Sequence, residues 1–182
     1  MALVKSKMIE LGSPAPSFEL EDVVTNQKVS LIKGSKATLV MFICNHCPYV
    51  KHLFDGLVSL GKDYQGEEVR IYAISSNDVK NYPQDNPEKM KELAVEQGFN
   101  FPYLYDPSQE VAKAYSAECT PDFFLYDENL ELAYRGQFDN SSPGKEVPVT
   151  GRDLRAAIDA CLNAEKPSLE QIPSMGCNIK WL

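Results

Sequence analysis

The sequence predicts an α/β protein in which helices pack against a mixed central sheet. Strand-like segments alternate with segments of helical spacing through the middle of the chain, which favours parallel strand pairing. Two further strand-like segments and a final helix follow, and these add an antiparallel hairpin. The chain has 182 residues, of which 43% are hydrophobic and 24% are charged, enough for a single domain with a buried core. We therefore expect one domain spanning residues 1–182.

Strands are expected where short runs of apolar, β-branched or aromatic residues are bounded by turn residues. The predicted strands are residues 18–20, 28–31, 37–43, 69–75, 101–105, 122–126 and 130–135. The first two form a hairpin around Thr25-Asn26-Gln27, and the last two form a hairpin that turns at Asp127-Glu128-Asn129. The run 37–43 is the most apolar and predicts a strand buried on both faces.

Helices are expected at residues 48–64, 88–97, 107–115 and 152–162. Pro48 suits the first turn of a helix, Asp106 suits an N-cap, and Gly98 suits the position after a helix ends. Residues 77–87 and 141–150 read as loops. Residues 163–182 have little regular pattern, but they end in an apolar segment that contains the only tryptophan, Trp181. We expect this segment to be a docked tail.

Charge and composition exclude several classes of partner. The formal net charge of −8 argues against nucleic acid or an anionic membrane surface as the main partner. The N-terminus has no apolar run before its lysines, and no segment is long and apolar enough to span a membrane, so a cytoplasmic protein is expected. Five cysteines in a reducing compartment are unsuited to a structural disulfide framework.

The most informative motif is Cys44-Asn45-His46-Cys47, which follows the buried strand and precedes Pro48. Backbone N–H groups are free at the start of a helix, and they stabilise a thiolate there. Two cysteines separated by two residues can also close a disulfide, so the motif predicts thiol–disulfide exchange. Cys44 is the expected nucleophile because it precedes the helix and should be more exposed than Cys47. His46, when protonated, would favour the Cys44 thiolate, and Cys47 would resolve the mixed disulfide.

These features together resemble the thioredoxin superfamily. The dithiol falls at the strand-to-helix junction of that fold, and Thr120-Pro121 precedes a strand, as does the loop with the cis-proline in that family. The hairpin before the core and the segment 101–115 resemble the redoxin branch, which holds AhpC/TSA proteins. The closest similarity is to thioredoxin-like proteins with Cys-Asn-His-Cys-Pro-Tyr-Val and a Gly-Cys-x-Ile-Lys-Trp tail. The resemblance covers about residues 10–162.

The resemblance implies a thioredoxin-like α/β/α sandwich with a mixed central sheet and an N-terminal β-hairpin. It implies a cis bond before Pro121 and a Thr120 backbone that pairs with a substrate strand. The implied activity is that of a thiol–disulfide oxidoreductase, with a disulfide-containing protein or a small thiol as substrate and an unidentified reductant. Neither a bound cofactor nor a resident metal is expected.

The motif departs from its relatives at several positions. Ile43 replaces the tryptophan that precedes the thioredoxin dithiol, and Asn45-His46 replaces its Gly-Pro. Thr38 falls where thioredoxin has a buried acid. The peroxiredoxin signature P-x-x-x-T-x-x-C is absent as well, because Val40 and Cys44 fall at its Pro and Thr positions when Cys47 is aligned with its cysteine. A thiol peroxidase therefore stays an alternative that lacks its motif.

Other roles for the cysteines and histidines remain open. Cys44, Cys47, His46 and His52 are ligand types that suit Zn or Cu(I), so a metal-binding or redox-regulated interaction module is a second alternative. No second C-x-x-C completes a structural zinc site. Cys119, beside Thr120, is either an auxiliary thiol or a small buried residue. Cys177 would resolve a disulfide if the tail folds back onto the dithiol, and Cys161 is expected in the core.

Overall fold

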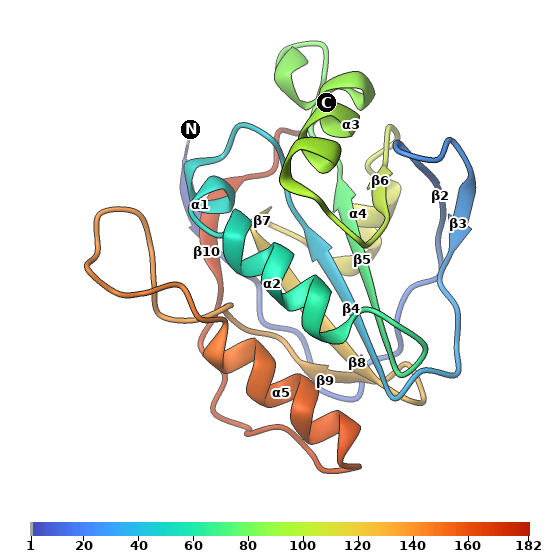
Figure 1. The fold of residues 1–182 in the computed structure, drawn as a ribbon, viewed down its shortest axis with the longest axis vertical. Helices are drawn as coiled ribbons and strands as arrows, with labels where there is room; N and C mark the ends of the chain where they lie inside the picture. The colour runs from blue at the N-terminus through green and yellow to red at the C-terminus, as the bar shows by residue number, and fades with distance from the viewer. Residues whose placement is uncertain (1) are drawn as a thin grey trace.

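The computed structural model describes residues 2–182, and a seven-stranded mixed sheet forms its centre (Figure 1). In spatial order the strands are β3 (Lys28–Ser30), β2 (Glu19–Asp22), β6 (Tyr103–Tyr105), β5 (Val69–Ser75), β4 (Ala37–Phe42), β8 (Asp122–Asp127) and β9 (Leu132–Tyr134). Strand β5 runs parallel to both β4 and β6, and the other pairs are antiparallel. This confirms the thioredoxin-like α/β fold with an early β2–β3 hairpin.

Strand β4 lies between β5 and β8, and all of its residues are buried. Its side chains alternate between two hydrophobic clusters, as the two-residue period of a strand requires. Leu39 and Met41 join one cluster, whereas Val40 and Phe42 join the other. The apolar run of the sequence is explained by this position, because helices or loops cover both faces of the strand.

Helices α2 (Phe54–Tyr64), α3 (Pro87–Gln97) and α5 (Arg152–Leu162) cover one face of the sheet, and α4 (Glu110–Tyr115) covers the other (Figure 1). Each of the first three contributes apolar side chains to the cluster that contains Leu39, namely Leu57, Leu60, Met90, Ala94, Leu154 and Ile158. Helix α4 instead adds Ala112 and Tyr115 to the cluster that contains Phe42. The dithiol lies at the carboxyl end of β4, between these layers.

A second, three-stranded sheet is made from segments that are far apart in the sequence. Its strands are β1 (Leu3–Lys5), β10 (Met175–Asn178) and β7 (Cys119–Thr120), with β10 in the middle and both pairings antiparallel. The segment 163–182 thus runs back from α5 and places β10 against α1 (Pro48–Lys51) and β7 (Figure 1). None of these three short strands was predicted from the sequence.

The predicted helix 48–64 is wrong in its continuity, because it divides into α1 and α2. The backbone N–H of Leu53 bonds to the carbonyl of Val50, three residues earlier, at 2.9 Å. This tighter turn ends the first helix after one turn, and α2 restarts from Leu53. The loop 77–87 also contains a short 3₁₀ helix, η1 (Pro83–Asp85), which the sequence did not predict.

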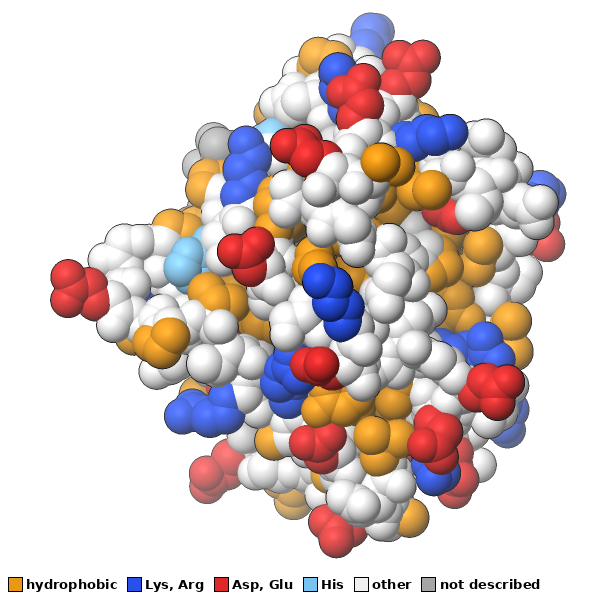
Figure 2. All heavy atoms as spheres, in the orientation of Figure 1, with side chains coloured by type: hydrophobic (Ala, Val, Ile, Leu, Met, Phe, Trp, Pro, Cys, Tyr) orange, Lys and Arg blue, Asp and Glu red, His pale blue; other side chains and the backbone are white. Residues whose placement is uncertain are grey.

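The surface carries acidic and basic side chains in mixture. On the face drawn in Figure 2, Lys and Arg side chains are interspersed with Asp and Glu side chains, so the net charge of −8 does not gather into one patch there. None of the helices in residues 2–182 combines the length and apolar character that crossing a membrane requires.

Candidate active site: the Cys44–Cys47 dithiol

The two cysteines of the motif lie under the surface at the junction between β4 and α1. Cys44 is 1% exposed and Cys47 is 0% exposed. Both thiols are therefore buried, and their exposure does not distinguish the expected nucleophile Cys44 from Cys47. Cys47 forms the N-cap of α1 and Pro48 its first residue, as the motif predicted. Because α1 has only four residues, a long helix dipole does not act on the dithiol, and local N–H groups act instead.

Thr120 contacts both sulfur atoms. The bond between Thr120 and Pro121 is cis, as the resemblance implied. The Thr120 hydroxyl lies 3.4 Å from Cys44 Sγ, and the Thr120 carbonyl accepts a hydrogen bond from Cys47 Sγ at 3.1 Å. The structure therefore brings together the residues that were predicted to form the site from two distant segments of the chain.

The dithiol is electrostatically asymmetric. A hydrogen bond from the Cys44 thiol lowers the pKa of Cys47 to about 5, against the effect of burial, and hydrogen bonds from Cys177 and Val50 add to this lowering. The same hydrogen bond raises the pKa of Cys44 well above its usual range, and burial and the Asp85 carboxylate raise it further. The lower pKa was expected at Cys44. That expectation is wrong, because Cys44, Cys177 and Val50 all donate toward Cys47, whereas at Cys44 burial and the Asp85 carboxylate act against the single Thr120 hydroxyl.

Asp85 is the residue of the site that the sequence analysis missed. It is 0% exposed, at the end of η1, and its carboxylate accepts hydrogen bonds from three groups. The backbone N–H of Asn45 and the side chain of Asn77 donate to it at 2.8 Å, and His46 Nδ1 lies 2.5 Å from it. The loop that holds Asp85 looks ordinary in sequence, and nothing there marks which of its polar residues turns inward.

His46 is held between Asp85 and a tyrosine. Its ring stacks on Tyr82, with centroids 5.3 Å apart and planes 14° from parallel, and its side chain is 10% exposed. A protonated His46 would favour a nearby thiolate, but its partner Asp85 carries the opposite charge and raises the pKa of Cys44. The stabilisation of a Cys44 thiolate that the sequence predicted from His46 is therefore offset by a residue from another loop.

A candidate cation site overlaps the dithiol. Three atoms that could bind a metal ion, one each from Cys44, His46 and Asp85, lie within 4.8 Å of one another. The Asp85 oxygens, however, are already engaged by three groups of the protein, whereas His46 Nε2 has no hydrogen-bond partner among residues 2–182. His52, which the sequence offered as a fourth ligand, does not belong to this cluster.

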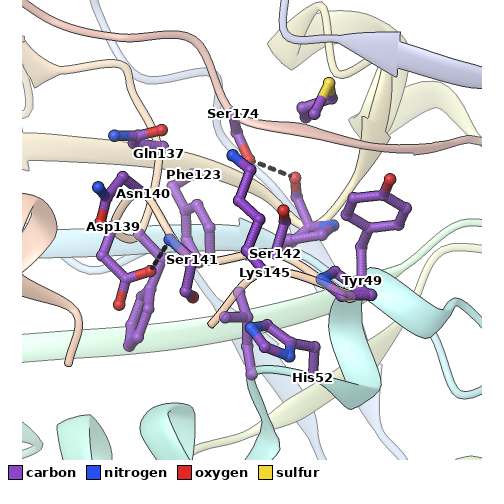
Figure 3. A pocket seen from close by; sticks show the side chains of 15 residues that line it. Tyr49, His52, Phe123, Gln137, Asp139, Asn140, Ser141, Ser142, Lys145 and Ser174 are labelled. Carbon is purple, nitrogen blue, oxygen red and sulfur yellow. Dashed lines mark hydrogen bonds between the residues drawn. The ribbon is translucent and has the colours of Figure 1, made fainter. Parts of the chain in front are cut away.

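His52 instead lines a small pocket beside the cis-proline. Figure 3 shows it with Tyr49, Lys145 and Ser142, and with Ser174 donating a hydrogen bond to the Pro121 carbonyl at 2.8 Å. The pocket has a cavity volume of about 60 Å³. This is room for a small group or a pair of waters. His52 is half-buried, and its Nε2 atom has no hydrogen-bond partner.

The three remaining cysteines differ in their surroundings. Cys119 is fully buried, its sulfur lies 3.9 Å from the Ser6 hydroxyl, and burial followed by the Asp122 charge raises its pKa. Cys161 lies in the core on α5, and burial raises its pKa to about 11. Both suit packing. Cys177 lies on β10 opposite Thr120 and donates a hydrogen bond toward Cys47, so the tail brings a third thiol to the dithiol.

We expect the reduced protein to carry one thiolate well below neutral pH. Because the pKa of Cys47 is lowered to about 5, the thiolate should be present above that pH and should be lost as the pH falls through it. The ultraviolet absorbance of the thiolate, recorded against pH, measures this transition. It should vanish in Cys47→Ser and persist in Cys161→Ser; a first transition near the ordinary thiol pKa of about 8.5 would contradict the prediction.

Comparison with known proteins identifies the family to which this fold belongs. The AhpC/TSA family matches residues 11–135. An uncharacterized conserved protein from Geobacillus kaustophilus is 51% identical, with a TM-score of 0.97 over 100% of this chain and 97% of that one. A hypothetical protein from Sinorhizobium meliloti is 46% identical, with a TM-score of 0.95 over 98% of both chains.

A thiol:disulfide interchange protein from Chlorobium tepidum shares the fold at 18% identity. Its TM-score is 0.64 over 85% of this chain and 99% of that one. Comparison with curated proteins gives no match. The family match covers more than half of the sequence and includes the dithiol and the cis-proline. The chain therefore belongs to the AhpC/TSA family of thioredoxin-like proteins.

Proposed function

We propose that the protein is a thiol–disulfide oxidoreductase that uses Cys44 and Cys47. The observation that carries this proposal is the pair of hydrogen-bonded thiols beside the cis-proline, one of which has a pKa lowered to about 5. A pair that shares one proton can supply both an attacking thiolate and a leaving group near neutral pH. The substrate is a disulfide in a protein or in a small molecule.

The reaction begins when the Cys44 proton passes to Cys47 along their hydrogen bond. The Cys44 thiolate attacks one sulfur of the substrate disulfide, and the other substrate sulfur leaves as a thiolate. The Thr120 hydroxyl, 3.4 Å away, is placed to donate to Cys44 Sγ. Cys47 then attacks Cys44 Sγ, the bond between Cys44 and the substrate breaks, and the departing substrate sulfur takes up the Cys47 proton, which leaves the Cys44–Cys47 disulfide. An external reductant, a dithiol or a reductase, restores the pair.

The groups around each thiol indicate which of the two attacks first. Cys47 is enclosed by the Thr120 carbonyl and by Cys177, so an incoming disulfide has little access to it. Cys44 lies in the loop before α1, next to the Thr120 hydroxyl. We therefore assign attack to Cys44 and resolution to Cys47, whose lower pKa favours loss of its proton in the second step.

A pair of serine substitutions tests this assignment. With a disulfide-linked peptide as substrate, Cys47→Ser should stop after one attack and accumulate a mixed disulfide through Cys44, because the resolving thiol is missing. Cys44→Ser should lose turnover by at least about a thousandfold, as expected when a covalent nucleophile is removed. Mass spectrometry of the acid-quenched reaction identifies the adduct. Full turnover by Cys44→Ser would refute the mechanism, and Cys161→Ser is the matched control.

A thiol peroxidase is the second candidate, and membership of the AhpC/TSA family favours it. In that reaction a thiolate attacks a peroxide, becomes a sulfenic acid, and condenses with a second thiol to a disulfide. The absence of the peroxiredoxin Pro and Thr positions counts against it. The two reactions separate in one measurement, because a peroxidase consumes a stoichiometric amount of hydrogen peroxide much faster than a free thiol does, whereas an oxidoreductase does not.

A further inference from the structure

The backbone pairing that a substrate strand would make with Thr120 is made here by the chain itself. Strand β10 runs antiparallel to β7, with Cys177 opposite Thr120 and Asn178 opposite Cys119. On its other edge β10 pairs with β1, where Leu3 lies opposite Cys177. The C-terminal strand thus fills the edge beside the cis-proline, and it places Cys177 opposite Thr120, next to the dithiol.

At Gly176 the backbone of β10 lies very close to the backbone of Thr120. A Cβ atom at this position would lie 2.0 Å from the Thr120 carbonyl oxygen and 2.6 Å from its carbonyl carbon. Both are backbone atoms, so the neighbouring residue cannot move aside as a flexible side chain would. A glycine is therefore required for β10 to reach the residue before the cis-proline.

The pairing of β10 with β7 places a third thiol, that of Cys177, beside the dithiol. The thiol and the backbone N–H of Cys177 both donate hydrogen bonds to Cys47. Burial first, and then this contact with Cys47, raises the pKa of Cys177 to about 12, so Cys177 keeps its proton while Cys47 is a thiolate. When Cys47 is instead in a disulfide, it carries no charge, and the part of this shift that comes from Cys47 is removed.

We propose that β10 is an intramolecular occupant of the substrate-strand site and that Cys177 is a third redox-active thiol, which exchanges with the Cys44–Cys47 disulfide at Cys47. The Cys177 thiolate attacks Cys47 Sγ, the Cys47–Cys177 bond forms, and the Cys44–Cys47 bond breaks. Cys44 leaves as a thiolate and takes up the proton that Cys177 lost. The exchange needs no external oxidant, because the number of disulfides stays at one. This inference rests on the proposed function, since it starts from the Cys44–Cys47 disulfide.

The exchange has a consequence for catalysis. It returns Cys44 to the reduced thiol form, while the disulfide now joins Cys47 at the start of α1 to Cys177 in the tail. A protein substrate can pair with Thr120 only after β10 leaves, because β10 occupies that edge, and Cys44 and Cys47 are at most 1% exposed when β10 is docked. Occupancy of the site by the tail therefore limits access of protein disulfides, whereas small reagents are less affected.

Disulfide mapping in a variant without Cys44 tests the third thiol. Diamide, a small oxidant that accepts two electrons and two protons from a pair of thiols, is added to reduced Cys44→Ser. After an acid quench and alkylation, peptide mass mapping should find Cys47 joined to Cys177. The matched double variants separate the two neighbouring thiols: Cys44→Ser/Cys119→Ser should still form the bond, and Cys44→Ser/Cys177→Ser should not.

The outcomes decide between the proposals. If Cys47 pairs with Cys119, or if Cys177 is alkylated in full while Cys47 is oxidised, the role of Cys177 is refuted. The proposed function is judged separately, on the wild-type protein, by turnover of a peptide disulfide and by formation of the Cys44–Cys47 bond. Wild-type turnover without a Cys47–Cys177 bond in the variant would leave the oxidoreductase standing and overturn the third thiol alone.

A glycine substitution tests the occupied strand site. Gly176→Ala should detach β10 from β7, and alkylation of the dithiol by a bulky maleimide in the native reduced protein should become at least about tenfold faster, which equals about 1.4 kcal/mol lost from the docked state. Gly66→Ala is the control, because the nearest atom to its Cβ lies at 3.9 Å. Circular dichroism checks the fold. Equal alkylation rates in a folded Gly176→Ala would overturn the strand assignment.

Discussion

Arg135→Met is expected to lower the free energy of unfolding by about 3–5 kcal/mol, because it leaves Asp122 charged and unpaired in the core. Arg135 and Asp122 are both 0% exposed and form a two-pronged ion pair, with the second hydrogen bond at 3.0 Å. Arg135 also donates to the Phe123 carbonyl at 3.1 Å, and its guanidinium lies 3.8 Å from the ring centroid of Phe124. Urea unfolding of the reduced protein, monitored by circular dichroism, measures the loss.

The buried ion pair is also connected to the cis-proline segment of the active site. Asp122 follows the cis-proline directly and accepts hydrogen bonds from the Ser6 hydroxyl at 2.6 Å and the Glu118 N–H at 3.0 Å. Arg152→Met is the matched control, because Arg152 pairs with Asp153 at the surface and is 71% exposed. It should change stability by less than about 1 kcal/mol. Equal losses in the two variants would contradict the importance of the buried pair, whereas Arg135→Met/Asp122→Leu should regain part of the loss.

Asp85→Ala should both destabilise the protein and change the titration of the dithiol. It removes the acceptor for the Asn45 N–H, the Asn77 side chain and His46 Nδ1, and an unsatisfied buried group costs about 1–3 kcal/mol. We expect a loss of at least about 2 kcal/mol. The pKa of Cys44 should fall, because the Asp85 carboxylate contributes to raising it. Urea unfolding and the thiolate absorbance against pH measure the two effects.

Two further variants separate charge from hydrogen bonding. Asp85→Asn keeps an acceptor for the Asn45 N–H but removes the charge, so it should lower the pKa of Cys44 with a smaller loss of stability. Asp78→Ala is the control from the same loop, since the Asp78 carboxylate accepts from the Lys80 N–H and the Asn81 side chain. It should leave the thiolate titration unchanged. An unchanged titration in Asp85→Asn would show that Asp85 positions the loop without acting on the thiols.

Local patterns were sufficient for most of the central sheet. The apolar run at 37–43 predicted the strand that became β4, and β5, which is buried except at Arg70, was equally evident. Gly98 ends α3 in the left-handed conformation that its position after the helix required. The prediction of one continuous helix over 48–64 failed because the chain makes a tighter turn from Val50 to Leu53, and hydrophobic periodicity alone does not show such a turn.

Local sequence patterns did not predict which charged side chains are buried. Arg135 stands at the end of a predicted strand and reads as a surface residue, yet it is wholly buried because Asp122, thirteen residues earlier, neutralises it. Asp85 lies in a loop of polar residues, and only the position of Asn45 and His46 across the fold makes it the acid of the dithiol. In both cases the partner that makes burial favourable is distant in sequence.

By itself, the sequence determined the α/β fold class, the position of the dithiol between a buried strand and Pro48, and the presence of Thr120-Pro121 before a strand. These depend on residue type, short spacing and local backbone preference. Only the tertiary structure decided that Cys47 has the lower pKa, that Asp85 faces Cys44, and that Cys177 opposes Thr120. Thiol pKa values and strand partners are set by groups a few ångströms away in space, and in this chain those groups come from four separate segments.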